Sequence, residues 1–223
     1  IAIAMGLIGF VGYAEIRGFR ASISMVGRLV IDTAQDYGLS VVPIFILMGL
    51  FVNKGGLSRE LYQVSNAFLG HFRGGLAMAT IVACAGFSAI CGSSLATAAT
   101  MSKVAMPQMR KYNYADSLST ASIAAGGTLG ILIPPSVFLV IYGLLTETSI
   151  GKLFIAGIIP GLLGVVLYLV AVRFTVLRNP AAGPAGERTN WADRGRAVRG
   201  VWAVLLLFFI VIGGLYGALN IWP

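Results

Sequence analysis

The stretch Gly126-Gly127-Thr128-Leu129-Gly130-Ile131-Leu132-Ile133-Pro134-Pro135-Ser136 lies in the middle of thirty uncharged residues between Asp116 and Glu147. The length of the uncharged stretch predicts a transmembrane segment. The two prolines predict that its helix is broken, because they lack a backbone donor and exclude the preceding residue from the α region. Broken backbone in hydrocarbon survives only where it is buried in protein or faces a polar cavity. The break is therefore a candidate ion or substrate site, which points to a transporter.

The composition predicts an all-α integral membrane protein. Of the 223 residues, 57% are hydrophobic and 11% are charged, whereas soluble domains carry about 25% charged residues. The last three of six uncharged stretches are long enough to span a bilayer, and the first two look short, tilted or truncated. The six stretches are 1–14, 37–53, 74–102, 117–146, 153–172 and 200–223.

The net charge of +8 does not indicate nucleic-acid binding, because the cations lie in loops and at helix ends, where they set membrane orientation. For the arginine-rich segment 174–199 we expect a cytoplasmic linker, with contact to anionic lipid as a secondary role. Cys84 and Cys91 lie in an apolar stretch and are expected to be packing residues. No catalytic or metal-binding motif is present, so we expect neither an enzyme nor an organic cofactor.

The segment from Gly74 to Arg110 predicts a helical hairpin. It is too long for one span and too short for two, and Gly92-Ser93-Ser94 divides it into arms of about 23 Å, less than the roughly 30 Å of hydrocarbon. Basic residues flank both ends, so the hairpin is expected to enter and leave on the cytoplasmic side. Its tip would then lie deep in the membrane.

These patterns divide the chain into five parts. Scaffold-type membrane and amphipathic helices are expected over 1–73, although the orientation of 1–36 stays open. The other parts are a transport-type unit over 74–149, with the re-entrant hairpin at 74–111 and the broken helix at 116–146, a membrane helix at 150–173, the linker at 174–199 and a further membrane helix at 200–223.

Several helix ends are expected to meet at mid-membrane depth. The N-termini near Ser93-Ser94 and near Pro135-Ser136 suit a carboxylate, and the C-termini near Cys91-Gly92 and Leu129-Gly130 suit Na⁺. Hydroxyls from Ser88, Ser93, Ser94, Thr97 and Thr128 complete the expected oxygen shell. The uncharged stretches hold none of the ionisable residues that proton relays use, which favours Na⁺ coupling.

A simpler interpretation also exists. The glycines between Gly126 and Gly130 can serve close helix packing, the prolines can produce a kink, and the small residues of 93–100 can form a helix interface. The two motifs together favour a site over packing alone.

Several motifs occur in an order that resembles the large membrane subunit of TRAP (tripartite ATP-independent periplasmic) transporters. The resemblance covers about residues 43–178. Its motifs are PIFILMG (43–49), NKGGL (53–57), GHFRGG (70–75), GSSLATAA (92–99), GILIPPS (130–136), IGKLF (150–154) and GIIPG (157–161).

The resemblance implies one repeat of an inverted-repeat, elevator-type fold, with a re-entrant hairpin and a discontinuous helix. It implies Na⁺-driven import of small organic acids across the bacterial inner membrane, with a periplasmic substrate-binding protein and a small four-helix membrane subunit as partners. The residue chemistry and the resemblance together assign two sets of site residues. The ion set is Gly92, Ser93, Ser94, Gly127, Thr128, Gly130 and Pro134, and the substrate set is Ser94, Thr97, Pro135 and Ser136.

Two other classes stay open at this point. A passive channel can also be built from a re-entrant hairpin, and the chain can be a structural membrane subunit. The family's large subunit is about twice as long as this chain, so we expect a first repeat with the start of a second, which would not transport alone.

Overall fold

The computed structural model describes residues 2–35, 41–186, 189–202, 206 and 209–210. Within these residues every regular element is helical, so the all-α prediction is confirmed there. The chain divides into two compact units, residues 1–43 and 44–223. The predicted membrane helix at 200–223 lies almost entirely outside the described residues.

The first unit contains two helices, α1 (Ala2–Arg17) and α2 (Phe19–Gln35). They are joined at Gly18, whose φ of +87° favours glycine. Apolar side chains cover the outside of α1, among them Ile3, Leu7 and Val11. This exposure is typical of a helix that faces lipid or a partner.

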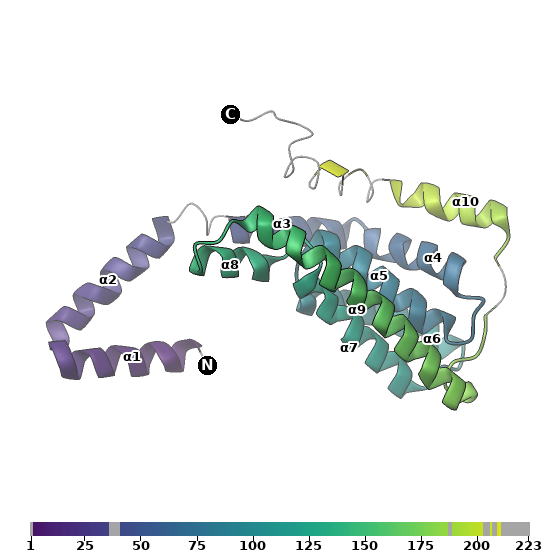
Figure 1. Cartoon of the computed structure of the whole chain (residues 1–223), viewed down its shortest axis with the longest axis horizontal. Coiled ribbons are helices and arrows are strands. Elements are labelled where there is room, and N and C mark those ends of the chain that lie inside the picture. The colour runs from purple at the N-terminus through teal and green to yellow at the C-terminus, as the bar shows by residue number, and fades with distance from the viewer. Residues whose placement is uncertain (1, 36–40, 187–188, 203–205, 207–208, 211–223) are drawn as a thin grey trace. The chain divides into compact units, whose positions relative to one another are not determined.

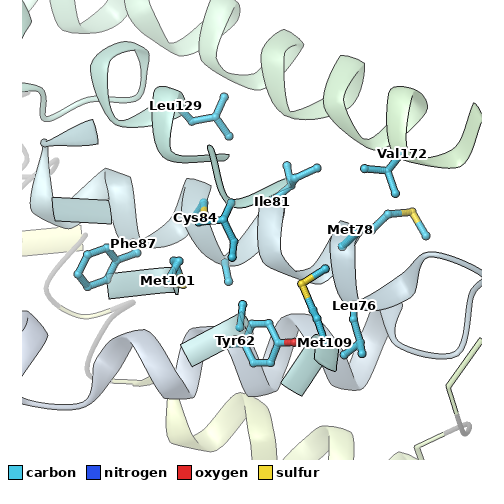
Figure 2. Close-up of a cluster of buried hydrophobic side chains, with 14 of the residues drawn as sticks. Tyr62, Leu76, Met78, Ile81, Cys84, Phe87, Met101, Met109, Leu129 and Val172 are labelled. Atoms are coloured by element: carbon cyan, nitrogen blue, oxygen red, sulfur yellow. The ribbon is translucent and has the colours of Figure 1, made fainter. Parts of the chain in front are cut away.

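The second unit is built around α5 (Gly75–Cys91), which packs against α4 (Leu57–Leu69), α6 (Ser94–Lys111), α7 (Asp116–Leu132) and α9 (Ile150–Arg178). The helix α3 (Val41–Lys54) precedes α4 in the chain. Fourteen of the 17 residues of α5 are buried, so neighbouring helices enclose this helix almost completely. Figure 2 shows the apolar cluster at this centre. Its labelled side chains are Tyr62, Leu76, Met78, Ile81, Cys84, Phe87, Met101, Met109, Leu129 and Val172.

The long uncharged stretch forms two helices, α7 and α8 (Val137–Leu145), separated by residues 133–136. In Figure 1 they follow one another with a short interruption, and α9 runs beside both. Asp116–Leu145 and Ile150–Arg178 are long and apolar enough to cross a membrane. The outer side of α9 exposes Ile159, Leu162 and Leu163, as expected of a lipid-facing helix.

The end of the helix before the break differs from the sequence prediction. This helix ends at Leu132 rather than near Leu129-Gly130, because the N–H of Ile133 still donates to the carbonyl of Leu129 at 2.9 Å. The first residue without a donor is Pro134, and a proline excludes the residue before it from the α region, so Ile133 is extended and the helix ends at Leu132.

The segment expected to be a linker is partly helical. α9 continues to Arg178, a short 3₁₀ helix follows at Pro180–Ala182, and α10 spans Trp191–Gly200. The side chain of Asn190 accepts the N–H of Trp191 at the start of α10. Arg194 donates to the carbonyl of Ala67 at 3.1 Å and thereby fastens α10 to α4. Charge pattern alone did not reveal this contact, because it depends on a partner more than a hundred residues away.

Candidate functional site

The tip of the α5–α6 hairpin packs directly on the break between α7 and α8. The carbonyl of Gly92 accepts the N–H of Val137 at 3.2 Å. The hairpin tip therefore supplies the acceptor for the first backbone N–H of α8. A Cβ at Gly92 would lie 2.7 Å from the carbonyl oxygen of Pro135, and the φ of this residue is +61°. Only glycine suits both the conformation and the approach. The structure thus brings together the two motifs that the sequence singled out.

The glycines of α7 face the hairpin. A Cβ at Gly127 would lie 2.9 Å from the Cβ of Ala98, and one at Gly130 would lie 2.9 Å from the backbone nitrogen of Ser94. On the same helix, a Cβ at Gly126 would lie 2.8 Å from the Sγ of Cys84. The packing interpretation of these glycines is therefore correct. It is also what allows the start of α6 to approach the end of α7.

A second set of glycines closes the site from α9; both belong to the GIIPG motif at 157–161, but the sequence did not assign them to the site. A Cβ at Gly157 would lie 2.7 Å from the carbonyl oxygen of Leu132, and one at Gly161 would lie 2.9 Å from the Cγ1 of Ile133. Their spacing of four residues is the small-residue pattern of membrane helix interfaces. That spacing was a visible signal for these positions.

Serines cap the helices that leave the tip and the break. The hydroxyl of Ser93 accepts the N–H of Ala96 at 3.4 Å, and that of Ser136 accepts the N–H of Leu139 at 3.4 Å. The hydroxyl of Ser136 also donates to the carbonyl of Ile131 at 2.8 Å. Pro135 has no N–H to offer that carbonyl, so Ser136 replaces the missing donor.

The other predicted hydroxyls do not all lie at the hairpin tip. Thr97 is fully buried, donates to the carbonyl of Ser93 at 2.8 Å and lies 3.3 Å from the hydroxyl of Ser88. Thr128 is exposed, and its hydroxyl contacts the carbonyl of Ala125 and the hydroxyl of Tyr168 on α9. The structure therefore brings Ser88, Ser93 and Thr97 together, whereas the Thr128 side chain points toward α9.

The site offers backbone dipoles rather than charged side chains. Pro134, which is buried together with Pro135, removes the N–H that would close the helical bond to the carbonyl of Gly130. Two helix N-termini, of α6 and α8, start beside this carbonyl-rich end, which combines anion-binding and cation-binding backbone ends in one place. Within the described residues, no group of three or more His, Cys, Asp or Glu side chains could hold a metal ion. Neutral oxygens of this kind suit an alkali cation.

The opposite end of the hairpin, its base, is held by side chains and a crossing segment. The hydroxyl of Tyr114 donates to the carbonyl of Pro184 at 2.8 Å and accepts the N–H of Leu76 at 3.2 Å. Burial raises the pKa of this phenol above its usual value. The backbone N–H of Gly74 donates to Gly183, and that of Ala115 donates to Ala182. The segment after α9 therefore ties the two ends of the hairpin together.

One charged residue of the hairpin was overlooked in the sequence. Lys103 lies in the middle of α6, nine residues after Ser94 and eight before Lys111. Together with Arg59 of α4 it lines two adjoining cavities. A lysine halfway along an arm predicted to enter the membrane is itself a signal of function.

Comparison with known proteins agrees with this geometry. Residues 1–221 match the family model described as "Tripartite ATP-independent periplasmic transporter, DctM component". The chain is 40% identical over 196 residues to the C4-dicarboxylate TRAP transporter large permease protein DctM of Pseudomonas aeruginosa, with 87% of this chain and 45% of the relative covered.

Two further relatives carry different substrate names. The ectoine/5-hydroxyectoine TRAP transporter large permease protein UehC of Ruegeria pomeroyi is 36% identical over 208 residues, with 93% of this chain and 48% of the relative covered. The sialic acid TRAP transporter permease protein SiaT of Haemophilus influenzae is 32% identical over 185 residues, with 83% and 30% covered. The chain thus spans half or less of the length of these relatives.

Proposed function

The chain belongs to the DctM component family of the tripartite ATP-independent periplasmic transporters, and on that premise we propose that it forms part of a Na⁺-coupled permease for small organic acids. As a member of this family it is a transmembrane transporter subunit and not an enzyme. The proposal concerns the coupling ion, the class of solute, the mechanism and the partners.

The observation that carries the proposal is the direct contact between the hairpin tip and the helix break. The carbonyl of Gly92 is bonded to Val137, and the N-terminus of α6 lies against Gly130. Opposed backbone ends of this kind provide a cation site and a carboxylate site without charged side chains. We assign Na⁺ to Gly92, Ser93, Ser94 and the 127–134 backbone, and the solute carboxylate to the N-termini at Ser94 and Ser136.

The mechanism that we propose is an elevator, in which the hairpin and the broken helix move together as one body. Their shared core supports this, because α5, α6 and α7 pack on one another and Ile81 and Cys84 of α5 are buried in the common cluster (Figure 2). A small four-helix membrane subunit would brace the fixed part, and a periplasmic binding protein would deliver the solute. The expected location is the bacterial inner membrane, which the chain would cross several times.

The test is solute uptake by proteoliposomes that contain the complete membrane complex. Radiolabelled succinate, sialic acid and ectoine are offered with and without an inward Na⁺ gradient, and with and without the cognate binding protein. We expect uptake of one solute that needs both the gradient and the binding protein. Uptake that is indifferent to both would contradict the proposal and favour a passive channel.

A further inference from the structure

Three cavities follow α6 from the hairpin tip toward the base, and the two that lie away from the tip have polar linings. At the tip, a cavity of about 100 Å³ is lined mainly by apolar residues, among them Leu50 and Phe87, with Ser93 and Thr100 as its hydroxyl groups. Thr100 also lines the next cavity, of about 560 Å³, which shares Arg59 and Lys103 with a third, of about 450 Å³. Adjoining cavities share lining residues, Thr100 between the first two and Arg59 and Lys103 between the last two, so we treat the three as one groove between α6 and its neighbours. We call it the α6 groove.

The middle of the α6 groove is cationic. Arg59, Lys103 and Lys54 line it, and Glu60 is the acidic residue among its lining side chains. Within the described part of the chain neither Arg59 nor Lys103 takes part in an ion pair; the pairs there are Arg110 with Asp116 and Arg196 with Asp193. Two cations without a carboxylate partner leave a local excess of positive charge.

The groove also offers neutral hydrogen-bond donors. The side-chain amides of Gln63, Asn66 and Gln108 line the cavity nearest the base. Amides and cations together match a carboxylate, which accepts several hydrogen bonds at once. An apolar occupant would not need such a lining.

Lys103 is exposed, and its position along the hairpin arm distinguishes it from the basic residues at the base. At about 1.5 Å per residue, it lies roughly 14 Å from the start of α6 at the tip and roughly 12 Å from its end at the base. If the hairpin enters the membrane, the backbone of Lys103 lies within it, where a charge is retained only for a function or beside water. The α6 groove supplies that polar surrounding.

We propose that the α6 groove is an anion path, in which Lys103 and Arg59 attract the carboxylate of the solute as it passes between the hairpin tip and the compartment at the base. The inference rests on the proposed function, since the solute must be an organic acid. It adds a second anion site to the backbone site at the tip. Ser93 and Thr100 lie where the two meet.

The test measures charge selectivity in the α6 groove directly, without transport. Gln63 is exposed and lines both larger cavities, so a Gln63→Cys variant, with Cys84→Ala and Cys91→Ala as background, places one thiol there. Its labelling rates with an anionic and a cationic methanethiosulfonate reagent are compared in zwitterionic nanodiscs. We expect the anionic reagent to be favoured, and Lys103→Gln to reduce the rate ratio roughly tenfold, within the range of local charge effects on ion concentration.

The controls separate the possible causes. Lys111→Gln, on the same helix but outside the lining of these three cavities, should leave the ratio unchanged, and Arg59→Gln should reduce it as Lys103→Gln does. The solute carried by the complex should slow labelling of the introduced thiol. Equal ratios in all variants would overturn the proposal even if Lys103→Gln alone failed to fold, because Arg59→Gln tests the same groove.

Two further outcomes are distinguishable. If phosphatidylglycerol slows labelling and the solute does not, the α6 groove binds a lipid headgroup and the proposal is wrong. Uptake by the unsubstituted complex is measured from the same preparation. Na⁺-dependent uptake without charge-selective labelling contradicts the anion path alone, whereas charge-selective labelling without Na⁺-dependent uptake contradicts the proposed coupling.

Discussion

Ser93 at the hairpin tip and Ser136 at the helix break hold nearly the same backbone conformation, with φ and ψ of −131° and 122° in one and −122° and 125° in the other. Each accepts a helix N–H at 3.4 Å. They differ in the hydroxyl proton. Ser136 is fully buried and donates to Ile131, whereas the hydroxyl proton of the partly exposed Ser93 has no acceptor among the described residues.

The difference separates two roles within one site. At the break, the prolines remove backbone donors, and Ser136 is used to satisfy a carbonyl that would otherwise be buried without a partner. At the tip, the chain turns through Gly92 with φ of +61°, and no proline removes a donor. Ser93 is partly exposed, so its hydroxyl oxygen stays accessible, whereas that of Ser136 is enclosed. This is the difference behind our proposal that Ser93, and not Ser136, binds the coupling ion. The substitutions below test this division, in order of decreasing effect.

Gly92→Ala should have the largest effect, because it disrupts the contact on which both regions depend. The new Cβ would lie 2.7 Å from the Pro135 carbonyl in a left-handed conformation, which by itself costs about 1–2 kcal/mol for a non-glycine residue. We expect loss of uptake and a clear fall in thermal stability, measured by fluorescence-detected size exclusion after heating. Gly195→Ala in α10, where nothing lies within 4 Å, is the matched control and should leave both unchanged.

Ser136→Ala should cost about 2 kcal/mol of unfolding free energy, because it leaves the buried carbonyl of Ile131 without its donor and removes a helix cap. The Na⁺ concentration for half-maximal uptake should stay unchanged in the protein that remains folded. A shifted Na⁺ dependence with unchanged stability would reverse the assignment of Ser136 as a structural residue.

Tyr114→Phe tests whether loss of a hydrogen bond at the base of the hairpin changes Na⁺ dependence, as we expect at the tip, or changes only stability. It removes the hydrogen bonds to Pro184 and Leu76, which should lower the free energy of unfolding by about 1.5 kcal/mol. Uptake per folded molecule and its Na⁺ dependence should not change. Tyr112→Phe, at an exposed neighbouring tyrosine, serves as the control for removal of a phenol.

Ser93→Ala should have the smallest effect on stability, below about 1 kcal/mol, because it removes only a cap. Its main effect should be on Na⁺. Na⁺ would be coordinated by a lone pair of the Ser93 hydroxyl oxygen, and loss of one polar contact to a charged partner costs about 1.5 kcal/mol, so the Na⁺ requirement should rise roughly tenfold. Uptake is measured against Na⁺ concentration for Ser93→Ala and Ser136→Ala side by side. Equal Na⁺ curves would contradict the difference between the two serines.

The N-terminal capping residues and the position of the break were predictable from local chemistry. Pro134 and Pro135 have no N–H in any fold, and Gly92-Ser93 combines a turn residue with a helix cap. The helix end was misplaced by about three residues because the donor of Ile133 still reached Leu129, a detail of hydrogen-bond register. Lys103 was not predicted as a site residue, because the cavities that it lines are formed together with Arg59 of α4, and a single charge in one helix does not encode that packing.

The sequence by itself determined that this is a helical membrane protein with two interrupted segments, because hydropathy and the missing proline donors act through neighbouring residues. Only the tertiary structure decided that the two interruptions meet, that Gly157 and Gly161 close the break, and that Ser93 and Ser136 differ in their free proton. The tertiary structure also decided that the Thr128 side chain points toward α9 and that Lys103 lines the α6 groove. These features depend on contacts between helices distant in the chain, and no local pattern encodes which side chains will face one another.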